Sequence, residues 1–86
     1  MKGLIGRHGL SHGEGLLIEP CNSIHTFFMR FPIDAVFYDR DKVVTAVYRR
    51  IKPWRVTGII SGAKGVLELP AEGSCNVDYG DRLVVV

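Results

Sequence analysis

The sequence lacks any long apolar run. A helix that crosses a bilayer needs about 18 consecutive apolar residues, and no segment of this 86-residue chain approaches that length. The N-terminal stretch Met1–Gly6 meets Arg7 and His8 too early to serve as a signal peptide. We therefore expect a soluble, cytoplasmic protein with no membrane partner.

Cysteine is also scarce. The chain has only Cys21 and Cys75, and neither belongs to a CxxC pair. A structural zinc site needs about four ligands at short spacings, so we expect no metal and no other cofactor. The two thiols are interpreted as free, small, partly buried groups, although a disulfide between them stays open.

Charge of one sign is not in excess. The formal net charge is only +2, with 23% charged and 47% hydrophobic residues, which is the composition of a globular chain. Cations concentrate only around Arg49, Arg50, Lys52 and Arg55. This mild balance argues against a nucleic-acid partner. A chain of this length is long enough for one small domain, residues 1–86.

Glycine, proline and aspartate divide the chain into short runs rich in β-branched and aromatic residues. We expect residues 1–14 to form a loop with one weak helical turn. The Asp39–Lys42 turn predicts a hairpin between the runs on either side of it. The prediction is a mostly β, single-domain barrel or sandwich of about six strands, because closure hides sheet edges. The expected strands are 15–20, 24–31, 35–38, 43–48, 64–70 and 82–86.

Histidine and cysteine suggest two possible sites, and both are weak. In an extended segment, Cys21 and His25 are about 13 Å apart, which is too far for a catalytic dyad. His25 is therefore either a hydrogen-bonded structural histidine, which we favour, or part of a ligand site. His8 and His12 have the i, i+4 spacing of metal ligands on a helix, but the glycines around them disfavour that helix.

Three charged residues interrupt apolar runs and form the main candidate site. Arg30 and Asp34 flank Pro32, where the chain must bend, and the bend could pair guanidinium with carboxylate. Glu68 alternates with two leucines in a later strand. One interpretation is a buried ion pair that fixes the bend. The other is a polar floor that presents Arg30 to an anionic ligand.

The single tryptophan also allows two interpretations. Trp54 lies next to Pro53 and between Lys52 and Arg55 in an irregular segment. An aromatic ring beside cations is typical of a contact for nucleic acid or an acidic partner. We favour the alternative, in which Trp54 covers the core beneath a loop.

Taken in order, several motifs resemble the uncharacterised DUF192 family. They are Gly3–Arg7, Gly13–Leu17, Thr26–Phe37, Val66–Ala71 and Gly80–Asp81. The resemblance implies a small, mostly β domain and no established reaction. The family positions matched here are Arg7, Gly13, Gly15, Met29, Arg30, Pro32, Asp34, Glu68 and Gly80–Asp81.

Two departures from the family pattern matter. Relatives usually have a further strand before the first motif, so we expect an unpaired sheet edge that a second copy could fill as a homodimer. Glu72 also stands before the glycine in the Val66–Gly73 region, where the family pattern differs.

Three functions stay open at this point. The first is a binding module that holds a small anionic ligand or a peptide or protein partner through Arg30, Asp34, Glu68 and His25. The second is a small hydrolase- or lyase-like enzyme that uses Asp34 or Glu68 as an acid or base. The third is a structural or self-assembly module.

Overall fold

The structure is a computed structural model that describes residues 4–5 and 15–85. Those residues form strands and connecting loops without any helix, so none of them could cross a membrane as a helix. The prediction of a mostly β domain with about six strands is confirmed. The strands are β1 (Leu4–Ile5), β2 (Leu16–Ile18), β3 (Ile33–Tyr38), β4 (Val44–Ile51), β5 (Gly65–Pro70) and β6 (Val84–Val85).

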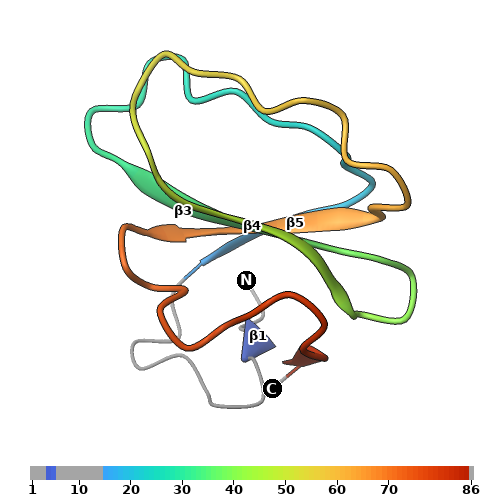
Figure 1. Ribbon diagram of the computed structural model, residues 1–86. Coiled ribbons are helices and arrows are strands. Elements are labelled where there is room, and N and C mark those ends of the chain that lie inside the picture. Colours follow the sequence, from blue (N-terminus) through green and yellow to red (C-terminus); the bar gives the residue numbers. More distant parts are fainter. Residues whose placement is uncertain (1–3, 6–14, 86) are drawn as a thin grey trace.

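Four strands form one open antiparallel sheet in the order β2-β5-β3-β4. β1 and β6 pair with each other as a separate two-stranded unit below this sheet (Figure 1). Closure into a barrel or a sandwich stays a prediction. Both central strands, β5 and β3, are short and, apart from Glu68 and Asp34, apolar, as expected for strands covered on two faces.

The predicted hairpin is confirmed. β3 and β4 pair antiparallel across the Asp39–Lys42 turn. The Asp39 carboxylate accepts hydrogen bonds from the amides of Asp41 at 2.8 Å and Val43 at 3.0 Å. Lys42 takes the left-handed conformation, with φ of 67°. The aspartate side chain therefore holds the turn by accepting from the backbone amides that follow it, which is a usual role for this residue.

Both faces of the sheet are covered. Because side chains alternate along a strand, Ile33, Ala35 and Phe37 of β3 face one core cluster, while Val36 and Tyr38 face the other. All six residues of β3 are buried. Residues 20–32 and 52–64 lie above the sheet in Figure 1, and residues 71–83 lie below it. We call the upper pair of segments the loop layer.

The strand expected over residues 24–31 is wrong. This segment makes only an isolated bridge between His25 and Val56, and it turns at Phe27 and Phe28. Its composition is typical of a strand, yet only Ile24 and Thr26 are buried, while both phenylalanines at the turn are exposed. The aromatic residues that suggested a central strand therefore serve the surface.

Most of residues 1–14 lie outside the described residues, including His8 and His12. Their expected loop and the metal interpretation stay predictions. Leu4 and Ile5 form β1, where a loop or weak helix was expected.

Candidate binding surface on the loop layer

Asp34 lies at an irregular point of the sheet. Ile33 pairs with Ile51 and Ala35 with Tyr48, so Arg49 and Arg50 together stand opposite Asp34. Two residues opposite one make a β-bulge, which leaves one amide without a ladder partner. The Arg50 amide donates to Asp34 Oδ1 at 2.9 Å. The Asp34 carboxylate thus accepts the hydrogen bond of the amide that the bulge leaves without a strand partner.

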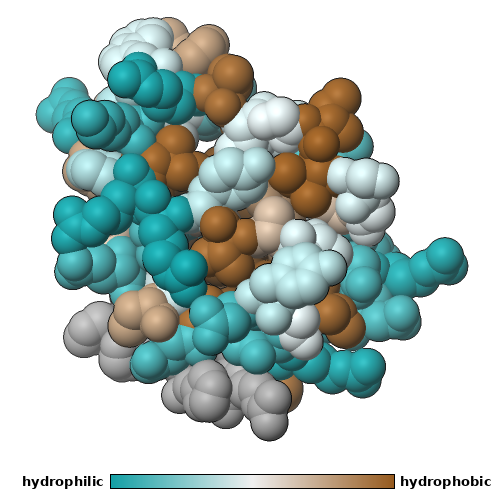
Figure 2. Space-filling view, in the orientation of Figure 1, coloured by the Kyte–Doolittle hydropathy of each residue, from teal (hydrophilic) through white to brown (hydrophobic). Residues whose placement is uncertain are grey.

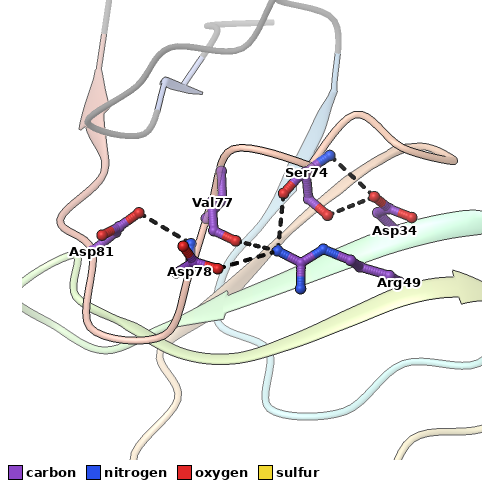
Figure 3. Close-up of polar contacts among 6 residues, drawn as sticks. All are labelled: Asp34, Arg49, Ser74, Val77, Asp78 and Asp81. Atoms are coloured by element: carbon purple, nitrogen blue, oxygen red, sulfur yellow. Dashed lines mark hydrogen bonds and ion pairs between the residues drawn. The ribbon is translucent and has the colours of Figure 1, made fainter.

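The second oxygen of Asp34 holds the segment below the sheet, residues 71–83, which we call the lower loop. Oδ2 accepts from the Ser74 amide at 3.0 Å and from the Ser74 hydroxyl at 2.5 Å (Figure 3). Asp34 is fully buried. Burial raises the pKa of its carboxyl group, but the hydrogen bonds from Ser74 and Arg50 outweigh burial and lower the pKa below its ordinary value. Asp34 is therefore a structural carboxylate.

The expected ion pair between Arg30 and Asp34 is wrong. Arg30 is exposed in the loop layer, above the sheet, whereas Asp34 bonds to the bulge and to the lower loop. Backbone amides and a serine hydroxyl stabilise the carboxylate in place of a guanidinium. The interpretation of Asp34 as a residue that serves the fold holds, with different partners.

Arg49 holds the same lower loop from the next position of β4. Its guanidinium donates to the carbonyls of Ser74 at 3.2 Å and of Val77, and it lies 3.6 Å from the Asp78 carboxylate (Figure 3). Charge-assisted bonds to carbonyls are stronger than neutral ones. Asp34 and Arg49 therefore fasten residues 74–78 against the sheet.

Glu68 and His25 lie on the upper side of the sheet. Glu68 is partly buried in β5, between Leu16 of β2 and Ala35 of β3. Burial raises the pKa of the Glu68 carboxyl group, and the nearby charge of His25 opposes this rise. His25 is exposed, and its Nδ1 accepts from the Phe27 amide at 3.3 Å. Of the four candidate residues, Glu68 and His25 thus lie on the same side of the sheet, while Asp34 bonds to the bulge and to Ser74 on the other side.

Both cysteines are free, as expected, but only Cys21 is partly buried, whereas Cys75 is exposed. The Cys21 thiol donates to the Ser23 carbonyl at 3.0 Å, and His25 accepts from the Phe27 amide, so each of the two side chains has its own partner. A pocket of about 220 Å³ lies beside Cys21, which lines it together with Pro20, Asn22, Ala63 and Lys64.

The two segments of the loop layer pair as an irregular ribbon. Thr57 donates its amide to the Ile24 carbonyl at 2.9 Å, and Ile60 donates to Asn22 at 2.8 Å. His25 and Val56 form the antiparallel bridge between the segments. Paired residues of a bridge point to the same side. The two-residue period then places Phe27 and Trp54 beside each other on that same side.

Thr26 joins the two segments at this end of the ribbon. Its hydroxyl donates to the Lys52 carbonyl at 2.7 Å and accepts from the Arg55 amide at 2.9 Å. Its own amide donates to the Arg55 carbonyl at 2.8 Å, and its carbonyl accepts from the Trp54 amide at 3.0 Å. Thr26 is only 1% exposed. This buried residue therefore sets the position of the aromatic side chains around it.

Phe27, Phe28 and Trp54 form what we call the aromatic face. Phe27 stacks on Trp54 with centroids 5.5 Å apart, and Phe28 meets Trp54 edge-on at 4.8 Å. Trp54 is 54% exposed and Phe28 is 81% exposed, so the expectation that Trp54 lies beneath a loop is wrong. Figure 2 shows apolar residues reaching the surface over this upper layer. Contiguous exposed apolar side chains indicate an interaction site.

Backbone strain occurs at two of these three residues. Phe28 has φ of 69° and Trp54 has φ of 64°. Bulky residues rarely take left-handed conformations, which cost about 1–3 kcal/mol and concentrate at binding and catalytic sites. The fold therefore holds these two rings in the solvent at an energetic cost.

Three cations lie within two residues of the aromatic face in the sequence. Arg30, Lys52 and Arg55, which we call the basic rim, are all exposed. The ion pairs among the described residues are Lys42–Glu19, Arg49–Asp78 and Arg50–Glu72, so none of them engages the rim. The loop layer also contains Lys64 and has no aspartate or glutamate in either segment. Although the net charge of the whole chain is small, the charged residues of the loop layer are therefore all positive.

The sequence contained a signal for part of this surface. Trp54 between Lys52 and Arg55 was a visible pattern, and one of its two interpretations was an anionic contact. Phe27 and Phe28 were missed because their run resembled a buried strand. The absence of acidic residues became meaningful only when the pairing of residues 20–32 with 52–64 placed them in one layer.

These features define a small all-β domain with an open antiparallel sheet and an exposed aromatic and basic surface. The chain belongs to the DUF192 family, described as "Uncharacterized ACR", which it matches over residues 1–85. The family resemblance drawn from the motifs is thereby confirmed.

A UPF0127 protein from Thermococcus sibiricus is 36% identical over 63 residues, which are 71% of this chain and 40% of that protein. The chain therefore spans less than half the length of that relative.

Two crystal structures share the fold. A protein of unknown function from Novosphingobium aromaticivorans superposes with a TM-score of 0.75 at 20% identity, covering 95% of this chain and 64% of that one. A chain from Sinorhizobium meliloti, described as a "putative transcription regulator", gives a TM-score of 0.70 at 25% identity, covering 96% and 70%.

Proposed function

We propose that this domain is a binding module that recognises an anionic partner through the aromatic face and the basic rim. The observation that carries the proposal is the composition of the loop layer. Six of the nine exposed large hydrophobic residues in the described chain lie there, together with four cations and no carboxylate. The six are Phe27, Phe28, Phe31, Trp54, Val56 and Ile59.

Physical chemistry gives each group a role. Exposed aromatic and arginine side chains supply most of the free energy at many binding surfaces. Cations that have no neighbouring acid raise the local concentration of anions and speed their association. Of the originally predicted site residues, Arg30 fits this surface directly, and His25 contacts it through Phe27, with ring centroids 4.7 Å apart. The description of the Sinorhizobium chain as a "putative transcription regulator" is compatible with an anionic partner.

Fluorescence of Trp54, the single tryptophan of the chain, tests the proposal directly. Three probes would be titrated: a 12-residue oligothymidylate, a 12-residue peptide of alternating Glu and Leu, and vesicles containing 30% phosphatidylserine. We expect at least one probe to change the Trp54 emission with saturation, and to bind more weakly as salt rises.

A pair of charge-matched variants supplies the control. Lys52→Gln/Arg55→Gln removes two cations of the rim, while Arg40→Gln/Arg82→Gln removes two exposed cations outside the loop layer. The first pair should weaken binding about tenfold or more, and the second should leave it within about twofold. Equal losses in both pairs, or no response to any probe, would refute the proposal.

A further inference from the structure

We infer that the anionic partner is a single-stranded nucleic acid whose bases stack on the aromatic face. This inference rests on the proposed function and names the partner class. Proteins that bind single strands without sequence preference combine stacked aromatic side chains with cations that follow the phosphates. The loop layer holds both components within a few residues of each other.

The arrangement of the rings favours bases over an acidic protein segment. Trp54 contacts both phenylalanines. Its ring centroid lies 5.5 Å from that of Phe27 and 4.8 Å from that of Phe28. The three side chains lie at the edge of a two-stranded ribbon and are all more than 40% exposed. Exposed rings offer π-faces to planar partners, whereas a peptide side chain is usually held in a desolvated pocket.

The distribution of charge supports the same partner. Arg30 follows Phe28 on one segment, and Lys52 and Arg55 flank Trp54 on the other, so cations lie on both sides of the rings in the sequence. A nucleic-acid strand carries one negative charge per nucleotide and is repelled by carboxylates. The absence of any acidic residue from the loop layer suits such a polyanion.

Stacking and phosphate contacts predict separate measurements. Anisotropy of a labelled 12-residue oligothymidylate would be followed for the wild type and for Phe28→Leu, Phe28→Tyr and Lys52→Gln. Loss of one stacked ring should weaken binding about 5- to 100-fold, and Phe28→Tyr should retain it within about threefold. Three phosphate contacts predict a slope of log K against log salt concentration of about −2, which Lys52→Gln should reduce by about 0.7.

A 12-base-pair duplex is the matched probe, because its bases are already stacked and paired. We expect it to bind at least about tenfold more weakly than the single strand. Equal binding of duplex and single strand, or an unchanged affinity in Phe28→Leu, would overturn the inference.

The outcomes separate the inference from the proposed function. If the Glu-Leu peptide or the phosphatidylserine vesicles bind through the basic rim and the oligonucleotide does not, the nucleic-acid inference fails and the binding module stands. If none of the three probes binds the folded wild-type protein, both fail.

Discussion

At the scale of single residues, the charged groups of the chain divide between the fold and the surface. Asp34 is fully buried and uses both oxygens on backbone and serine donors, so it stabilises the bulge and the lower loop. Arg30 stays in solvent beside the aromatic face. From the sequence it was clear that the Asp34 carboxylate, lying among apolar residues, needs hydrogen-bonding partners. Its partners include the backbone amides of Arg50 and Ser74, and a residue pattern cannot predict bonds to backbone amides.

Replacing Asp34 by asparagine should destabilise the domain by about 2–4 kcal/mol, because an amide donor then faces the donors of Ser74 or Arg50. The folded state lowers the pKa of Asp34, so its contribution is present above the ordinary value of 3.8 and is lost as pH falls below it. Urea unfolding of wild type and Asp34→Asn at pH 7 and pH 3 measures the difference in their free energies of unfolding, which should be smaller at pH 3. An equal difference between wild type and variant at both pH values would contradict the assignment.

Glu68 should behave in the opposite way. Burial raises its pKa above the ordinary value of 4.5, so ionised Glu68 opposes folding, and stability falls as pH rises through the folded-state pKa. We expect Glu68→Gln to stabilise the domain at pH 7 by less than about 1 kcal/mol, since the group is partly solvated. Thermal melts at pH 4 and pH 7 check this. The gain should vanish at pH 4, and the control is Asp41→Asn, which removes an exposed carboxylate that takes part in none of the ion pairs given above.

At the scale of elements, the strands β2 to β5 and the hairpin were predictable, whereas β1 and the loop layer were not. The runs that became β2, β3, β4 and β5 carry alternating or continuous apolar patterns between clear turn residues. Residues 24–31 carry a similar pattern but form an irregular segment. Their geometry depends on hydrogen bonds between Thr26 and residues 52–55, about 26–29 positions away, and such pairing cannot be read from local sequence.

Thr26→Val tests whether this one side chain positions the aromatic face. The valine is nearly the same size but lacks the hydroxyl that bonds Lys52 and Arg55, so stability should fall by about 1–3 kcal/mol. The Trp54 emission should also change, because Trp54 lies between these two residues. Thr26→Ser keeps the hydroxyl and should keep the wild-type emission. An unchanged spectrum in folded Thr26→Val would show that Thr26 does not position the ring.

At the scale of the whole molecule, the two layers that cover the sheet differ in charge. Residues 71–83 include Glu72, Asp78 and Asp81, whereas the loop layer has cations and no acidic residue. The net charge of +2 averages over this difference, and on that average a nucleic-acid partner was not expected. The fold separates the charges in space, which is why the composition alone pointed away from the proposed partner.

The most direct test of the binding surface is amide chemical-shift mapping with the 12-residue oligothymidylate and the Glu-Leu peptide. The account predicts that the perturbed amides cluster in residues 25–30 and 52–57, while those of residues 71–83 keep their shifts. Perturbations centred on residues 71–83, or none at saturating probe, would contradict the central claim that the loop layer is the binding surface.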